Sequence, residues 1–238
     1  MKLNMKKTKF GIVVFPGTWS DKDCYHAVNT ILGNQSIYIW HKETDLKNVD
    51  CLILPGGFSY GDYLRPGAIA RFSPVMNEII KFADSGKPVI GICNGFQILC
   101  EANLLPGILL PNNVMEFRCS NTHLKVQNNN STFTNECNNN QILNIPISHG
   151  EGNYFADPDT ISELENNNRI LFRYSSSNGE ITDDFNPNGS VNNIAGIINK
   201  KQNVLGMMPH PERSCEKELG STDGNYIFKS IMKSVSLA

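Results

Sequence analysis

The 238-residue chain has no long hydrophobic run and no strong excess of charge of either sign. No apolar stretch approaches the roughly 20 residues that a membrane-spanning helix needs, and the apolar segment after the basic start MKLNMKKTKF is too short for a signal sequence. Lys and Arg number 21 against 23 for Asp and Glu, a formal net charge of −2, which favours neither nucleic acid nor an anionic membrane as partner. We therefore expect a cytoplasmic protein whose ligands are small molecules or other proteins.

Regular cysteine and metal-ligand spacings are also missing. The seven cysteines are an odd number and include no CxxC pair, which argues against a disulfide framework and against a structural zinc site. No histidine occurs in a ligand spacing such as HExxH, and the glycine-rich segment GGFSYG lacks the following Lys-Ser/Thr of a phosphate-binding P-loop. We expect reduced thiols, no metal and no cofactor in this chain.

The length fits one large domain better than two, so we expect a single domain over residues 1–238. In the first half, four short apolar segments rich in β-branched residues predict strands. These segments are KFGIVVF (9–15), SIYIW (36–40), CLILPGG (51–57) and PVIGIC (88–93). Their apolar residues do not alternate with polar ones, which indicates a sheet covered on both faces.

Helices are predicted between these strands, over residues 20–33 and 73–86. Ser20 is the N-cap candidate of the first helix, and Ser73 with Pro74 begins the second. An alternation of strands and helices predicts an α/β fold with a parallel, doubly wound sheet.

The pattern changes after about residue 108, where strand-like pieces alternate with asparagine-rich breaks. We interpret the runs at 127–141 and 165–169 as solvated surface loops without a chemical role. Residues 193–212 predict a hairpin whose second strand enters a Pro-His-Pro turn, and residues 223–235 predict a closing helix.

The segment GICNGFQ places Cys93 between two glycines directly after an apolar strand. A sharp turn from a strand into a helix exposes the corner side chain, and the small neighbours Gly91 and Gly95 let backbone segments pass closely. This is the pattern of a nucleophile elbow with sulfur in place of a hydroxyl, and the start of a helix stabilises a thiolate. A buried structural cysteine at a tight junction would show the same short pattern.

A nucleophilic thiol needs a base, a group that orients the base, and donors for an oxyanion. In MMPHPERS, His210 and Glu212 are two residues apart and point to the same side of an extended segment, although a turn histidine held by two prolines is the alternative. His149 and Glu151 are a second candidate pair. The backbone N–H groups of Gly57 and Asn94 are the candidate oxyanion donors.

Together, GICNGFQ, PHPE and the upstream PGG resemble the class I, triad-type glutamine amidotransferases. Four longer segments are similar to the glutaminase subunits of phosphoribosylformylglycinamidine synthases of purine biosynthesis: LPGGFSYGDYLRPGAIARFSP, IPISHGEGNYFAD, NPNGSVNNIAGI and NVLGMMPHPERS. The resemblance covers nearly the whole chain. It implies a flavodoxin-like fold with a mostly parallel central sheet, flanking helices and an additional antiparallel region.

The same resemblance implies roles for individual residues in hydrolysing glutamine through a γ-glutamyl thioester. Cys93 would be the nucleophile, His210 the general base and acid, and Glu212 the group that orients His210. Residues implied at the substrate or in the oxyanion hole are Gly57, Phe58, Asn94, Gln97, His149, Gly150 and Glu151. One departure is visible, because Arg118 precedes Cys119 and Ser120 follows it where the family has a Phe-x-Cys-Arg pattern.

Nothing in the chain resembles an ATP site, so the resemblance implies that activation of formylglycinamide ribonucleotide occurs on another polypeptide. The expected partners are a synthetase subunit, which would hold ATP and magnesium, and a small accessory subunit, with L-glutamine as substrate. Two alternatives stay open from the residues alone. One is a stand-alone cysteine hydrolase of the same fold, and the other is a non-catalytic protein that retains the fold.

Overall fold

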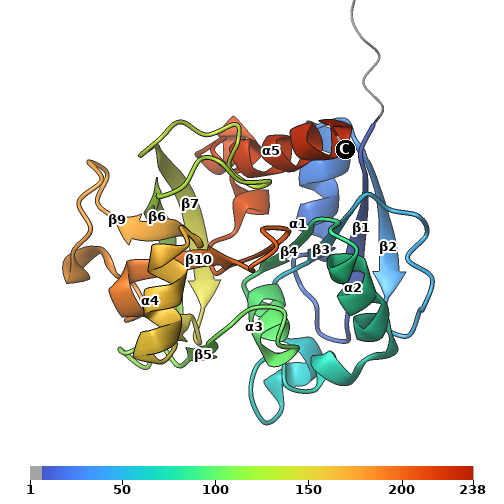
Figure 1. Ribbon diagram of the computed structural model, residues 1–238, viewed down its shortest axis with the longest axis horizontal. Coiled ribbons are helices and arrows are strands. Elements are labelled where there is room, and N and C mark those ends of the chain that lie inside the picture. Colours follow the sequence, from blue (N-terminus) through green and yellow to red (C-terminus); the bar gives the residue numbers. More distant parts are fainter. Residues whose placement is uncertain (1–6, 238) are drawn as a thin grey trace, which may run out of the picture.

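The computed structural model describes residues 7–237, which fold around a nine-stranded mixed sheet (Figure 1). The first six residues of the predicted basic start lie outside the described residues, as does Ala238. The strands of this sheet are β1 (Lys9–Val14), β2 (Gln35–Trp40), β3 (Cys51–Leu54), β4 (Val89–Ile92), β6 (Arg118–Val126), β7 (Ile142–His149), β9 (Ile170–Ser175), β10 (Ile194–Ile198) and β11 (Val204–Met207). A separate pair consists of β5 (Ile108–Leu110) and β8 (Asn153–Phe155).

The sheet has a parallel half and an antiparallel half. Its order is β2-β1-β3-β4-β11-β10-β9-β6-β7, and neighbours from β2 to β11 are parallel while those from β11 to β7 are antiparallel. Both β3 and β4 are buried along their whole length, as their unbroken apolar sequences predict. The predicted α/β architecture is confirmed, and the antiparallel region is larger than a minor addition because it supplies half of the strand pairings.

Helices cover both faces of the parallel half. The α-helices of the structure are α1 (Asp21–Tyr25), α2 (Pro74–Asp84), α3 (Asn94–Glu101), α4 (Pro158–Asn166) and α5 (Gly224–Leu237). In Figure 1, α1 and α5 lie on one side of the sheet, α2 and α3 lie on the other, and α4 accompanies the antiparallel strands. This two-sided covering is the doubly wound arrangement that the first half of the sequence predicts.

Both predicted helices of the first half are present, but their serine caps are not. The first continues from α1 as a π-helical segment, His26–Ile31, and the second begins with Pro74 as expected. Neither Ser20 nor Ser73 makes a capping hydrogen bond with its side chain. The hydroxyl of Ser20 instead accepts from Arg213, and that of Ser73 bonds to Tyr60, so tertiary contacts replaced the local ones.

The hairpin and the closing helix of the second half are confirmed by β10, β11 and α5. Residues 165–168 are exposed as predicted, but 165–169 is not a loop throughout, because its first two residues end α4. Its last residue, Arg169, is buried directly before β9. Helix α4 had a visible signal: Asp157 accepts from the N–H of Thr160, and Pro158 is the first helical residue.

The asparagine-rich segment 127–141 is only partly solvated. Phe133 and Thr134 in its middle are fully buried. Asn135 donates to the backbone carbonyl of Ser230 and to the hydroxyl of Ser234, both on α5. This segment therefore packs against the closing helix, which corrects the expectation of a surface loop.

The carboxyl ends of β3, β4 and β11 meet at one edge of the sheet because these strands are parallel neighbours. The chain leaves β3 at Gly56, β4 at Cys93 and β11 at His210, three segments far apart in sequence. In an open α/β sheet, this edge is where ligands bind. The topology thus gathers the predicted site residues in one place.

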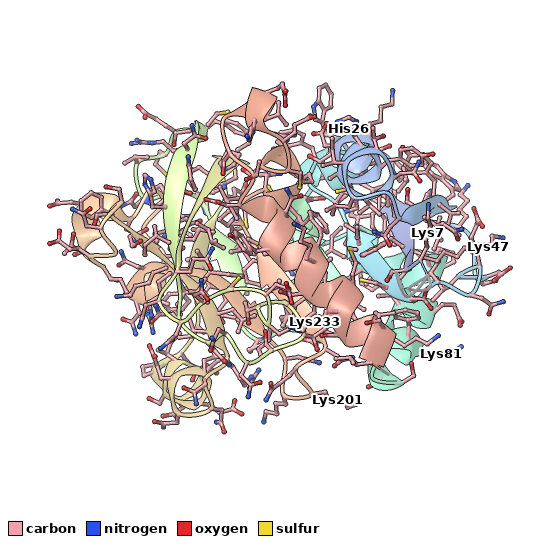
Figure 2. All side chains as sticks on the ribbon, turned by 90° about the horizontal axis from the view of Figure 1, so that it is seen from above. Lys7, His26, Lys47, Lys81, Lys201 and Lys233 are labelled. Carbon is pink, nitrogen blue, oxygen red and sulfur yellow. The ribbon has the colours of Figure 1, made fainter. Side chains whose placement is uncertain are left out.

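Several surface lysines are paired with carboxylates. Figure 2 shows Lys47, Lys81, Lys201 and Lys233 spread around the outside of the molecule. Each of these four lysines pairs with a carboxylate at 2.6 to 3.0 Å; the partners are Glu43, Glu78, Asp84 and Glu136. Over residues 7–237, no helix has both the length and the apolar character needed to cross a membrane.

Helix α3 passes so close to β3 that only glycine fits at Gly95. A Cβ atom at this position would lie 1.9 Å from the carbonyl oxygen of Leu54. We predict that Gly95→Ala lowers the free energy of unfolding by about 3 kcal/mol, because the helix must move away from the sheet. Thermal and denaturant unfolding measure this, with Gly150→Ala as control, since its Cβ would make only an ordinary contact of 3.5 Å with Phe117. Equal stability of the two variants would contradict the prediction.

Candidate active site

Cys93 lies at a strained corner between β4 and α3. Its φ of 52° and ψ of −108° are unusual for any residue with a side chain. The corner is held from both sides, because the N–H of Cys93 donates to Met207 on β11 at 2.8 Å and its carbonyl accepts from Phe96 at 2.9 Å. The predicted elbow backbone is therefore confirmed, whereas the expectation that the turn exposes the corner side chain is wrong, because the surrounding loops bury Cys93. The side chain is 5% exposed, and its sulfur lies 3.6 Å from the carbonyl oxygen of Ser148.

His210 and Glu212 form a buried pair directly after β11. The Nδ1 atom of His210 is 2.6 Å from Oε1 of Glu212, and both residues are 2% exposed. The N–H of His210 donates to Pro146 on β7, which fixes the backbone. With Nδ1 engaged by the carboxylate, Nε2 stays buried without a hydrogen-bond partner among residues 7–237. Nε2 is thus the atom of His210 available to a reacting group.

Gly56 brings the sulfur and the imidazole together. A Cβ atom on this glycine would lie 2.7 Å from Cε1 of His210 and 3.3 Å from Cβ of Cys93. The two side chains therefore flank the same point of the loop after β3, and a side chain at this point would separate them. The structure assembles the three predicted triad residues although Cys93 and His210 are far apart in sequence.

Electrostatics favours a protonated His210. Burial disfavours the charged imidazole, but the Glu212 carboxylate and the Cys93 sulfur beside it outweigh burial and raise the pKa of His210 to about 10. The imidazole accordingly holds a proton at neutral pH. Because the folded-state pKa lies above the ordinary 6.5, this charge stabilises the fold fully below pH 6.5 and the contribution is lost as the pH rises through 10.

Two backbone amides at the corner are free to bind an anion. The amide of Gly57 has no acceptor within residues 7–237. Backbone hydrogen bonds lie on either side of it, from the N–H of Phe58 to the carbonyl of Gly17 and from the N–H of Trp19 to the carbonyl of Gly56. The amide of Asn94, first residue of α3, likewise has none within this range. The predicted oxyanion donors are therefore unoccupied N–H groups near the nucleophile.

A chain of side-chain amides connects the loops around Cys93. Asn94 accepts from the N–H of Ser59 at 3.1 Å and donates to Gln97 at 2.9 Å. Gln97 then donates to the carbonyl oxygen of Glu151 at 2.6 Å. The loop after β3, the start of α3 and the loop after β7 are thus held in fixed positions relative to one another.

Asp62 belongs to this region, and no motif in the sequence singled it out. Its Oδ1 atom is 3.4 Å from the side-chain nitrogen of Asn94. Burial and the neighbouring Glu151 carboxylate raise the pKa of Asp62 to about 6, and burial also raises the pKa of Glu151. A single aspartate in a glycine-rich loop has no spacing that could have predicted this contact.

His149 does not form a base and orienter pair with Glu151. Its Nε2 atom is 3.1 Å from the side-chain nitrogen of Asn188, which also donates to Gly152 at 2.8 Å. Burial, together with the charge of His210, lowers the pKa of His149 to about 3, so this imidazole is neutral. The neighbouring Gly150 accepts a backbone bond from Asn112, and Asn188 is a further buried residue that sequence reasoning missed.

A cavity of about 220 Å³ opens beside His210. Its lining residues are Trp19, Ser20, Gly57, Phe58, Phe117, Ser148, His210 and Arg213. Phe58 is at its mouth, 47% exposed and facing the ring of Phe117 at 6.4 Å. Arg213, which the sequence did not single out, donates to Asp23 and Ser20 and so connects the site to α1.

Neither of the remaining sequence features contributes to this cavity. Arg118 lies on β6 opposite His149 and approaches Glu116 at 3.7 Å, and Cys119 is exposed. Among residues 7–237, no three His, Cys, Asp or Glu side chains are grouped so that they could hold a metal ion.

Comparison with known proteins decides the family. Residues 7–226 match the model of the CobB/CobQ-like glutamine amidotransferase domain. The chain is 58% identical over 224 residues to the phosphoribosylformylglycinamidine synthase subunit PurQ of Moorella thermoacetica. This match covers 94% of this chain and 95% of that protein. The PurQ of Salinibacter ruber is 52% identical over 229 residues, covering 96% and 97%. This chain belongs to the PurQ family of glutamine amidotransferases.

Solved structures agree with membership of the PurQ family. A chain in the structure of PurLQS from Thermotoga maritima matches with a TM-score of 0.85 and 39% identity, covering 97% of this chain and 100% of that one. A second glutamine amidotransferase from Thermotoga maritima shares only 15% identity, with a TM-score of 0.54 and coverage of 97% and 94%, and supports the fold alone. The predicted resemblance and the amidotransferase fold are confirmed.

The buried Glu212 carboxylate should control the protonation of His210. We predict that Glu212→Gln lowers the pKa of His210 well below 10, because burial then acts without the carboxylate that offsets it. NMR titration of the His210 ring nitrogens measures this. Glu216→Gln is the matched control, since Glu216 contacts the half-exposed His26 at 3.0 Å in a second His–Glu pair. A pKa of His210 that stays near 10 in Glu212→Gln would show that another group holds the charge.

Proposed function

We propose that the chain is the glutaminase subunit of a phosphoribosylformylglycinamidine synthase. It hydrolyses L-glutamine to glutamate and ammonia, and it supplies the ammonia to a synthetase subunit. That subunit converts formylglycinamide ribonucleotide to formylglycinamidine ribonucleotide with ATP. The observation that carries the proposal is the buried His210–Glu212 pair beside Cys93 at a strained corner, in a chain that matches PurQ proteins over nearly its full length.

The first half-reaction forms a thioester and releases ammonia. The Cys93 sulfur, whose proton is held by His210, attacks the carboxamide carbon of glutamine as a thiolate. The carbonyl oxygen becomes an oxyanion that accepts from the N–H groups of Gly57 and Asn94. His210, protonated at neutral pH, gives its proton from Nε2 to the departing nitrogen. The C–N bond breaks, ammonia leaves, and a γ-glutamyl thioester remains on Cys93.

The second half-reaction restores the enzyme. The now neutral His210 takes a proton from a water molecule, and the water oxygen attacks the thioester carbon. The carbonyl oxygen again becomes an oxyanion that accepts from the N–H groups of Gly57 and Asn94. The C–S bond breaks, glutamate leaves, and the sulfur again lies beside a protonated imidazole. Glu212 keeps Nδ1 of His210 in place in both half-reactions and compensates the charge of the buried ring.

Glutamine is held by the loops that converge on Cys93. Phe58 forms a wall at the mouth of the cavity, and Gln97 fixes the backbone of Glu151 through a 2.6 Å bond. His149 is the last residue of β7, and Gly150 and Glu151 follow it on the side of the site where Ser148 contacts the sulfur. The Glu151 carboxylate provides negative charge for the α-ammonium group of the substrate.

A partner docks over the mouth of the cavity. Trp19, Phe58 and Phe117 line this cavity and are 72%, 47% and 53% exposed, an apolar rim that a protein partner would cover. The structure of PurLQS from Thermotoga maritima contains a chain similar to this one. The complex then comprises this chain, a synthetase subunit that holds ATP and magnesium, and a small accessory subunit.

The cysteines of this chain, free over the residues described, suit a reducing cytoplasm.

Glutamate release from glutamine tests the proposal. We expect the purified chain alone to be weakly active, and strong stimulation by the synthetase and accessory subunits with ATP and formylglycinamide ribonucleotide, because an uncoupled glutaminase would waste glutamine. Cys93→Ala should abolish release while the fold is retained. Cys119→Ala, which removes an exposed thiol on β6, should leave release unchanged.

Two results would contradict the proposal. Brisk glutamate release that is equal with and without partners would indicate a stand-alone hydrolase. Full activity of Cys93→Ala in the complex would exclude a cysteine mechanism and leave the chain a scaffold.

A further inference from the structure

The loop after β3 is strained beyond the glycines that begin it. Tyr60, Asp62 and Leu64 all have positive φ angles, of 56°, 52° and 71°. This left-handed conformation costs a residue with a side chain roughly 1–2 kcal/mol relative to its usual conformations. Three such residues in five positions remain strained only where other contacts hold the loop. Tyr60 makes two of these contacts with its side chain.

The Tyr60 hydroxyl joins this loop to two distant elements. It lies 2.7 Å from Nδ1 of His41, which follows β2, and 2.9 Å from the hydroxyl of Ser73, which precedes α2. A phenol hydroxyl can donate one bond and accept another, so one group satisfies both partners. His41 is 5% exposed and Ser73 4%, and the rings of His41 and Tyr60 meet edge to face at 5.6 Å. The half-buried Tyr60 is therefore held by two buried partners in a directional contact.

The anchored residue is three positions from the amide of Gly57. Between them, the N–H of Phe58 donates to Gly17 at 2.9 Å and the N–H of Ser59 donates to Asn94 at 3.1 Å. The N–H of Tyr60 itself donates to Pro16 at 2.6 Å. The backbone from Gly57 to Tyr60 is thus a short, bonded segment, and a shift of its far end would move the Gly57 amide relative to the sulfur.

We propose that Tyr60 is a positioning residue for catalysis, whose hydroxyl, held by His41 and Ser73, fixes the Gly57 amide in the oxyanion hole. Tyr60 acts through the loop backbone and does not touch the substrate. The inference rests on the proposed glutaminase function and assigns the hydroxyl to the step in which charge develops on the carbonyl oxygen. Loss of the hydroxyl therefore slows thioester formation more than it weakens glutamine binding.

The test is Tyr60→Phe in the complex with the synthetase and accessory subunits. Because the ring stays, we expect the fold and KM to change little. We expect kcat and the single-turnover rate of thioester formation to fall about tenfold, which corresponds to the loss of one hydrogen bond worth roughly 1.4 kcal/mol. Ser73→Ala removes one of the two partners and should cause a smaller loss of the same kind. Tyr63→Phe is the matched control, because Tyr63 lies in the same loop, is 68% exposed and should retain wild-type kcat.

Alkylation of Cys93 by iodoacetamide, followed on its peptide by mass spectrometry, separates positioning from general loosening. This reaction needs the nucleophile but no oxyanion hole, so its rate should be unchanged in Tyr60→Phe. Wild-type kcat in Tyr60→Phe, or equal loss in alkylation and thioester formation, would overturn the inference while the glutaminase function stands. Absence of glutamate release by the wild-type complex would overturn the proposed function and this inference with it.

Discussion

The close approach of helix α3 to the sheet is the constraint on which the site depends. Because a Cβ atom at Gly95 would lie 1.9 Å from the carbonyl of Leu54, the helix can start directly at the end of β4 only with glycine there. The turn at Cys93, two residues before this contact, has an unusual backbone conformation. It places the sulfur at the first turn of a helix and leaves the Asn94 amide free. The candidate nucleophile and one candidate anion donor thus lie where the helix approaches the sheet most closely.

The second constraint is the burial of charge. Placing an imidazolium and a carboxylate in a 2% exposed environment is costly unless each compensates the other, which the 2.6 Å contact between His210 and Glu212 provides. One carboxylate oxygen and Nε2 of His210 remain without partners among the described residues. Buried polar atoms of this kind are rare in folded proteins, and the imidazole that carries Nε2 lies beside Cys93.

The parallel half of the sheet explains how one site recruits distant segments. Strands β3, β4 and β11 end at the same edge, so the loop carrying Gly57, the corner at Cys93 and the turn at His210 come together without long connections. The antiparallel half contributes β7, whose end brings Ser148 to the sulfur and positions the His149–Glu151 segment. Exposed aromatic rings line the mouth of the site, and the loop behind it is held by the half-buried Tyr60 hydroxyl. The candidate active site and the proposed docking surface therefore lie on one edge of the fold.

The sequence by itself determined the local features. Unbroken apolar runs specified β3 and β4, and the glycines around Cys93 specified the elbow. The two-residue spacing placed His210 beside Glu212. These three features could be predicted because each one depends on residues only a few positions apart in the sequence. Helix α4 was missed although Asp157 and Pro158 marked its start, since the surrounding asparagines concealed the pattern. Only the tertiary structure decided that His149 pairs with Asn188, that Asp62 lies near Asn94, and that Tyr60 bonds to His41 and Ser73. These contacts join residues 13 to 39 positions apart, so they exist only after the strands have assembled and their loops have met.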